Sequence, residues 1–184
     1  MRKAKEYLVL SDSHGRTAHL TRLIEQLNFR PTAILFLGDG LRDLRVFEEH
    51  PTWRDIPVYA VAGNCDCFFD FTSAREPNCR LLPVGTHRIF MTHGHLYGVN
   101  GGVTAAAHNA LAQGADVLLY GHTHIAAESY QTLHVRDEQG QYTEKTLLVA
   151  NPGSIGEPRD GGGYRFGVLT LTDTSVLFSH GALS

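Results

Sequence analysis

The sequence has few cysteines, no long apolar run and no excess of positive charge. Its 184 residues include 3 cysteines, too few for a disulfide framework. The apolar stretch near the start, residues 7–10, is too short for a signal-peptide core, and no stretch approaches a membrane span. Lys and Arg total 16 against 19 for Asp and Glu, which counts against binding of long nucleic acid. These absences predict a cytoplasmic protein without a membrane segment.

The composition is otherwise that of an ordinary globular protein, with 42% hydrophobic and 19% charged residues. A chain of this length usually builds one core, so we expect residues 1–184 to form a single domain. Histidine is the unusual residue, with 11 copies. Because histidine is the commonest protein ligand for metals, the positions of these residues decide what the composition means.

Short apolar runs alternate with helical patterns in the first two thirds of the chain. The pattern predicts strands at 7–10, 33–37, 58–62, 89–91 and 117–120, and helices at 18–27, 41–49 and 103–112. Hairpins are predicted at 125–135 with 143–150 and at 165–171 with 175–179. Residues 64–80 indicate a loop, and its aromatic centre 68–71 would form a substrate wall, a subunit contact or a segment tucked onto the domain. The order of elements predicts an α/β fold of packed sheets with outer helices.

Five polar motifs begin where predicted strands end. They are Ser11-Asp12-Ser13-His14, Gly38-Asp39, Gly63-Asn64-Cys65-Asp66, Thr92-His93-Gly94-His95 and Gly121-His122-Thr123-His124. Because the carboxyl ends of parallel strands meet at one edge of a sheet, we expect these motifs to converge on one site. Residues i and i+2 of an extended segment point to the same side, so Asp12 pairs with His14 and His122 with His124. Carboxylate, imidazole and amide ligands favour Mn, Fe, Zn or Ni.

The order of these motifs resembles the signature of the calcineurin-like metallophosphoesterases. The match comprises Asp12-x-His14, Gly38-Asp39, Gly63-Asn64-x-Asp66, His93 and Gly121-His122-x-His124, and covers nearly the whole chain. The Gly63-Asn64-Cys65-Asp66 and Asn151-Pro152-Gly153-Ser154 segments are most similar to the small YfcE-type phosphodiesterases. The resemblance implies a four-layer α-β-β-α sandwich, in which helices flank two mixed sheets and two divalent metal ions lie at the strand ends.

The resemblance also implies the ligands and the reaction. The first ion would be held by Asp12, His14, Asp39 and His124, and the second by Asp39, Asn64, His93 and His122. Mn is the expected metal, with Fe, Zn, Ni or Mg as alternatives. The implied activity is hydrolysis of a small phosphodiester by a hydroxide bridging the two ions, with Asp39 and Asn64 in the catalytic centre.

Cys65 departs from the pattern of many relatives, which carry a histidine there as a candidate acid for the leaving group. A neutral thiol is a poorer proton donor to a basic alkoxide, so activated leaving groups are favoured. His95 either supplies part of this function as a catalytic residue or hydrogen-bonds a neighbouring ligand. Asp66 is expected to stabilise the turn in which it lies rather than to bind metal.

Other functions stay open at this point. A phosphomonoesterase, including a nucleotide phosphatase, would use the same residues. An interaction scaffold is a second alternative, because the retromer subunit of this family has lost catalytic ligands, but all seven predicted ligands are present here. A redox protein based on Cys65-x-Cys67 is a third. The sequence leaves open whether the chain forms a homo-oligomer.

Overall fold

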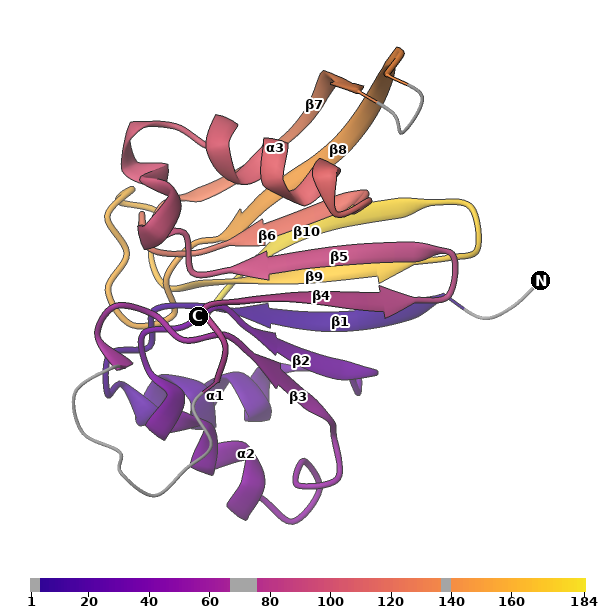
Figure 1. Ribbon diagram of the computed structural model, residues 1–184. Helices are drawn as coiled ribbons and strands as arrows, with labels where there is room; N and C mark the ends of the chain where they lie inside the picture. The colour runs from indigo at the N-terminus through magenta and orange to yellow at the C-terminus, as the bar shows by residue number, and fades with distance from the viewer. Residues whose placement is uncertain (1–3, 67–75, 137–139) are drawn as a thin grey trace.

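Two five-stranded sheets packed face to face form the centre of the structure, with helices on both outer faces (Figure 1). The structure is a computed structural model and describes residues 4–66, 76–136 and 140–184. Cys67 and the aromatic residues of the 68–71 segment therefore lie outside the described residues.

Sheet A contains a parallel core and an antiparallel flank. In spatial order its strands are β10 (Val176–Ala182), β9 (Arg165–Leu171), β1 (Lys5–Leu10), β2 (Ala33–Phe36) and β3 (Val58–Ala60). Strands β1, β2 and β3 are parallel, whereas β9 runs antiparallel to β1 and to β10. The carboxyl ends of β1, β2 and β3 therefore lie at one edge.

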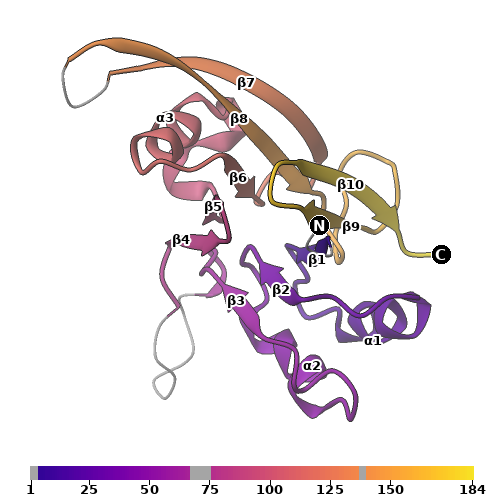
Figure 2. The same ribbon diagram turned by 90° about the vertical axis from the view of Figure 1, so that its right-hand side faces the viewer.

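Sheet B is built in the same way. In spatial order its strands are β4 (Cys79–Val84), β5 (His87–Thr92), β6 (Val117–Tyr120), β8 (Tyr142–Pro152) and β7 (Ala126–Arg136). Strands β5, β6 and β8 are parallel, and β4 and β7 are antiparallel to their neighbours. The β7–β8 hairpin extends away from the body of the sandwich (Figure 2).

The helices cover opposite faces of the sandwich. They are α1 (Thr17–Gln26), the 3₁₀ turn η1 (Leu41–Leu44) leading into α2 (Arg45–Glu49), and α3 (Thr104–Ala112), with further 3₁₀ turns η3 (His95–Tyr97) and η4 (Val99–Gly101). Helices α1 and α2 lie beside sheet A, and α3 lies beside sheet B (Figure 2). No helix within the described ranges is long and apolar enough to cross a membrane.

Alternation along β1 explains why the layers form. Tyr7 and Val9 point into the core between the two sheets, whereas Leu8 and Leu10 point into the core beneath α1 and α2. Both faces of the strand are buried, so its sequence is a continuous apolar run. The predicted four-layer α-β-β-α sandwich is confirmed, and this packing fixes the strand ends that carry the polar motifs.

Several predicted boundaries differ from the structure. The strand predicted at 58–62 ends at Ala60, and the helix predicted at 41–49 is a 3₁₀ turn followed by a short α-helix. Strand β4 was not predicted, and its first residues were assigned to the loop at 64–80. Pro83 hides this strand from pattern reading, because proline lacks an N–H and is tolerated in sheets mainly at an edge, where β4 lies.

Candidate metal centre

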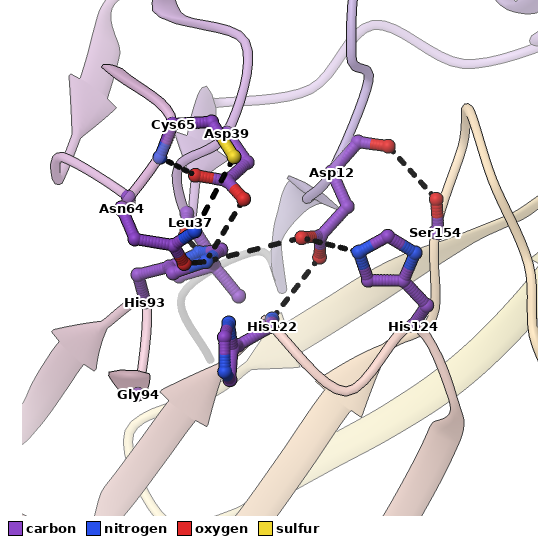
Figure 3. Close-up of polar contacts among 12 residues, drawn as sticks. Asp12, Leu37, Asp39, Asn64, Cys65, His93, Gly94, His122, His124 and Ser154 are labelled. Atoms are coloured by element: carbon purple, nitrogen blue, oxygen red, sulfur yellow. Dashed lines mark hydrogen bonds and ion pairs between the residues drawn. The ribbon is translucent and has the colours of Figure 1, made fainter. Parts of the chain in front are cut away.

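The side chains predicted to bind metal meet at one end of the sandwich, where strands of both sheets end. Loops after β1, β2 and β3 of sheet A carry Asp12, His14, Asp39 and Asn64, and loops after β5 and β6 of sheet B carry His93, His122 and His124. The predicted ligands therefore do converge, but the strand ends of both sheets, rather than of one sheet, bring them together (Figure 3).

Two buried carboxylates lie among the imidazoles. Asp12 Oδ1 is 3.2 Å from His124 Nε2 and 3.9 Å from His14 Nε2. Asp39 Oδ2 is 3.4 Å from His93 Nε2 and 3.8 Å from His14 Nε2. Donor atoms of Asp12, His14 and His124 all lie within 4.8 Å of one another, as do those of Asp12, Asp39 and His93. A third group, His14, Asp39 and Cys65, meets the same limit, so the centre contains three overlapping groups of possible ligand atoms, and Asp12 and Asp39 each belong to two of them.

Asn64 joins the second of these groups. Its Oδ1 lies 3.2 Å from His93 Nε2, so the amide oxygen faces the same space as the Asp39 carboxylate (Figure 3). A neutral amide adds a ligand oxygen without adding negative charge, which matters where the substrate is itself an anion.

The backbone at these positions has left-handed conformations. Among the described residues, the non-glycine residues with positive φ are all predicted ligands: Asp12 (56°), His14 (45°), Asp39 (57°), His122 (69°) and His124 (60°). Each such residue costs about 1 kcal/mol relative to an ordinary conformation. Conformations of this kind persist where the surroundings hold them, and they cluster at functional sites.

Asp66 holds the loops after β2 and β3 together. Its Oδ2 accepts hydrogen bonds from the backbone N–H of Asp39 (2.7 Å) and Gly63 (2.9 Å). Its Oδ1 accepts the N–H of Gly40 and of Leu41, both at 2.9 Å. As expected, Asp66 supports turns, and its oxygens do not face the ligand cluster.

Asp43 plays a similar part for the loop after β1. Its buried Oδ2 accepts hydrogen bonds from Ser13 Oγ (2.6 Å) and from the Gly15 N–H (2.8 Å), on either side of His14. Sequence reasoning missed Asp43, because it lies inside a segment that reads as an ordinary helix and belongs to no motif.

Two imidazoles are oriented by backbone carbonyl groups. His124 Nδ1 lies 2.6 Å from the Glu157 oxygen, and His93 Nδ1 lies 2.7 Å from the Leu37 oxygen. A ring that donates its Nδ1–H to a carbonyl presents a lone pair at Nε2, and a metal ligand needs that tautomer. Both Nε2 atoms point at Asp12 and Asp39.

The Asn151–Ser154 segment stabilises the same end of the sandwich through side-chain hydrogen bonds. Asn151 Nδ2 donates to the Gly121 oxygen (3.0 Å) and to Thr123 Oγ1 (3.1 Å), within the turn that carries His122 and His124. Ser154 Oγ donates to the Asp12 backbone oxygen at 2.8 Å (Figure 3). The segment therefore does more than make a turn, since it links the loops of both sheets.

Charge and burial act in opposite directions on the ionisable groups. Burial alone would raise the pKa of Asp39, but the hydrogen bond and charge of His93 and the Cys65 N–H hold that pKa well below its usual range. Burial alone would lower the pKa of His93, yet the Asp39 and Asp12 carboxylates raise it. The Asp12 carboxylate, 3.2 Å from His124 Nε2, likewise raises the pKa of His124. The Asp39 carboxylate therefore stays ionised and attracts positive charge.

Cys65 lies beside this cluster and stays a thiol. Burial, together with the nearby Asp39 carboxylate, raises the pKa of Cys65 to about 11. Its backbone N–H donates to Asp39 Oδ1 at 2.8 Å, so the residue helps to orient that carboxylate. A thiol with such a pKa has little thiolate at neutral pH, which counts against redox chemistry at this residue.

Two further side chains border the cluster. The His95 ring lies 5.4 Å from that of His93 and 6.2 Å from that of His122, and its Nδ1 is buried with no hydrogen-bond partner. Burial and the neighbouring His93 lower the pKa of His95. Sequence reasoning missed Asn100, whose Nδ2 lies 3.1 Å from His122 Nε2, because Asn100 is part of no ligand motif.

The residues fit a divalent metal. Asp12 Oδ1 is buried and accepts no hydrogen bond among the described residues, and a His124 ring that donates Nδ1–H to the Glu157 oxygen turns its Nε2 lone pair toward it. A carboxylate oxygen and a nitrogen lone pair that face each other repel, and a cation bound between them would remove this repulsion. Oxygen and imidazole ligands around two buried carboxylates suit Mn, Fe, Zn or Ni, and the overlapping groups offer more than one position.

The chain is similar to known phosphoesterases along most of its length. Residues 6–174 match the family model described as the calcineurin-like phosphoesterase superfamily domain. A relative in Bacillus subtilis, "Probable metallophosphoesterase YsnB", is 32% identical over 169 residues, covering 92% of this chain and 86% of the relative. "Phosphodiesterase YfcE" of Escherichia coli K12 is 32% identical over 123 residues, covering 65% of this chain and 56% of that protein.

Solved structures share the fold. A predicted phosphoesterase from Streptococcus pneumoniae TIGR4 superposes with a TM-score of 0.69 at 24% identity, covering 98% of this chain and 90% of the other. Vps29 of Entamoeba histolytica, solved with Zn²⁺, superposes with a TM-score of 0.60 at 21% identity, covering 97% and 99%. The family match agrees with the sandwich fold and with the cluster of possible metal ligands at its end. The chain belongs to the calcineurin-like phosphoesterase superfamily.

Proposed function

We propose that this chain hydrolyses small phosphodiesters at a centre of two divalent metal ions. The observation that carries the proposal is the ligand cluster, in which buried Asp12 Oδ1 has no hydrogen-bond donor among the described residues. Burying carboxylates without neutralising them is costly, so the site is built to receive positive charge. The name of the YfcE relative, a phosphodiesterase, favours the diester as substrate.

The predicted ligands fall into two sets, one for each metal position. Asp12, His14, Asp39 and His124 would hold one ion, and Asp39, Asn64, His93 and His122 would hold the other. Two divalent cations held there supply charge that activates water and stabilises the phosphoryl group in an in-line displacement. Asp39 is the shared ligand, and the Cys65 N–H and the support from Asp66 fix its orientation.

Asn64 and His95 are the groups we assign to the substrate side. The Asn64 amide keeps the net charge of the cluster low enough for a phosphodiester anion to enter. His95 has a buried Nδ1 without a partner beside the His93 and His122 rings. We assign it a hydrogen bond to the substrate, where many relatives use the histidine that Cys65 replaces.

Mn is the metal we propose, because the donor set holds hard oxygen ligands and imidazoles and the nearby thiol stays protonated. The few cysteines suit a reducing compartment, so we place the activity in the cytoplasm.

Hydrolysis by the metal-stripped and Mn-loaded protein tests the proposal. We expect Mn to restore activity, with bis(p-nitrophenyl) phosphate cleaved faster than p-nitrophenyl phosphate. Asp39→Ala should abolish hydrolysis and weaken binding of both ions, whereas Asp55→Ala, at an exposed carboxylate, should leave both unchanged. Activity retained in Asp39→Ala would contradict the assignment.

Other outcomes separate the alternative functions. Faster cleavage of the monoester would make the protein a phosphomonoesterase. A protein that binds two Mn ions and cleaves neither ester would fit an interaction scaffold. Binding of no more than one ion at micromolar concentration would exclude the two-ion centre.

A further inference from the structure

A metal-binding imidazole needs its second ring nitrogen fixed, and His122 differs from His93 and His124 in how this is done. His93 and His124 are fixed by backbone carbonyl groups, through Nδ1, and present Nε2 to the carboxylates. His122 has no such carbonyl contact among the described residues. Its Nε2 instead lies 3.1 Å from the Asn100 side-chain amide.

The Asn100 contact determines which His122 nitrogen is left for a metal. With Nε2 engaged by Asn100, Nδ1 is the ring nitrogen that remains. The His122 backbone is already tied to the centre, since its N–H donates to Asp12 Oδ2 at 3.2 Å, and its ring lies 5.1 Å from that of His93 (Figure 3). As placed, Asn100 Nδ2 faces Nε2; the amide turned over, which is nearly the same in shape, places Oδ1 there to accept Nε2–H, and this is the arrangement that leaves Nδ1 free for a metal.

Asn100 sits on a surface turn that is itself anchored. It is exposed, but the preceding residue Val99 is buried in the core beside α3. The backbone N–H of Gly101 donates to the Gly98 oxygen (2.9 Å), and that of Gly102 to the Val99 oxygen (3.2 Å). The turn is therefore defined well enough to hold one side chain against His122, while water still reaches that side chain.

We propose that Asn100 is a positioning residue that fixes the His122 ring with Nδ1 toward the second metal position and so sets the affinity of that position. The inference deepens the proposed function and rests on its two-ion centre. His122 belongs to the second position only, so loss of Asn100 affects one ion and spares the other. The loss of Asn100 should therefore weaken the second position and leave the first unchanged.

Metal binding without substrate tests this inference. Calorimetric titration of the metal-free protein with MnCl₂, checked by the electron paramagnetic resonance signal of free Mn²⁺, gives the number of ions and both affinities. We expect two ions in the wild type. In Asn100→Ala, the first ion should bind as in the wild type and the second about 10- to 100-fold more weakly.

Two further variants keep the test specific. Asn100→Asp retains an acceptor for Nε2–H and should restore most of the lost affinity. Asn28→Ala, at an exposed asparagine after α1, should bind both ions normally. Retention of the first ion in Asn100→Ala shows that the variant is folded.

Four results would overturn the inference: unchanged affinities in Asn100→Ala, equal weakening of both ions, tighter binding of the second ion, or a single ion in the wild type. Tighter binding would mean that the amide blocks the position instead of supporting it. The readout is independent of the proposed activity, because a protein that binds two ions and hydrolyses nothing still reports the effect of Asn100.

Discussion

Sheet A and sheet B bring their ligands to the same centre, but different groups hold them. On the sheet A side, Asp43 accepts the Ser13 hydroxyl and the Gly15 N–H on either side of His14. Asp66 accepts the backbone N–H groups of Asp39 and Gly40. On the sheet B side, carbonyl oxygens and the Asn151 amide hold the imidazoles and their turn. The contacts on the sheet A side therefore fix the path of the backbone, whereas those on the sheet B side fix the orientation of the imidazole rings.

The difference follows from the ligands themselves. A carboxylate has two equivalent oxygens and needs mainly a well-placed backbone, and the backbone at Asp12 and Asp39 is left-handed. An imidazole binds metal through one of two nitrogens, so the other nitrogen must be held to select the tautomer. The His93 ring is oriented by the carbonyl oxygen of Leu37, which follows β2 of sheet A, so a sheet B ligand depends on a sheet A loop.

The largest effect is expected where sheet A leaves no space for a side chain. A Cβ at Gly63 would lie 2.1 Å from Asp39 Oδ1 and 2.5 Å from the Asp39 nitrogen. Gly63→Ala must therefore displace Asp39, which we propose as the ligand shared by both ions, and we expect hydrolysis to fall at least about 100-fold. Gly101→Ala is the matched control in steady-state kinetics, because its Cβ would meet nothing within 4 Å. Full activity in Gly63→Ala would show that Asp39 is not shared.

Asp66→Ala should have the next largest effect, and on stability first. Four backbone N–H groups lose their acceptor, and two of them belong to buried residues, Asp39 and Gly63. We expect the free energy of unfolding to fall by about 3 kcal/mol, measured by urea denaturation of the metal-free protein. Asp66→Asn keeps one carbonyl oxygen and should lose about half as much. Equal losses in both variants would mean that the charge, rather than the hydrogen bonds, stabilises the turn.

Much of the fold and of the site is predictable because it follows from local patterns. Apolar runs such as residues 7–10, 33–36 and 117–120 are buried on both faces, and polar residues follow them at the strand ends. Asp12, Asp39, His93 and His124 could therefore be placed together before the arrangement of the sheets was known. The family resemblance then supplied the four-layer order.

The supporting groups are not predictable in this way. Asp43 acts through contacts with Ser13 and Gly15, and Asn100 through a contact with His122, all of them far along the chain. No periodicity marks such a contact, because it depends on how two loops pack after folding. Strand β4 was missed for a related reason, since an edge strand with Pro83 is defined by its neighbour β5 more than by its own sequence.

On the sheet B side, Asn151→Ala should cost about 2 kcal/mol of unfolding free energy. The variant removes two donors to the turn that carries His122 and His124, and the acceptor of the Gly153 N–H (2.9 Å). If this turn is held as we describe, binding of both Mn ions should weaken, because each position takes one of these histidines. Calorimetric titration measures this, and weakening of one ion alone would show that the two rings move independently.

The smallest effect is expected at Ser154, which joins the two sides. Its Oγ donates to the Asp12 oxygen and accepts the N–H of Gly156 (3.1 Å) and of Glu157. Ser154→Ala should lower the unfolding free energy by about 1 kcal/mol, and Ser179→Ala, at an exposed serine of β10, should lower it less. Glu157 also provides the carbonyl that orients His124, so Ser154→Ala should weaken the first ion more than the second. Asn100→Ala is expected to give the opposite order, and the two variants together test whether the two metal positions are supported by separate groups.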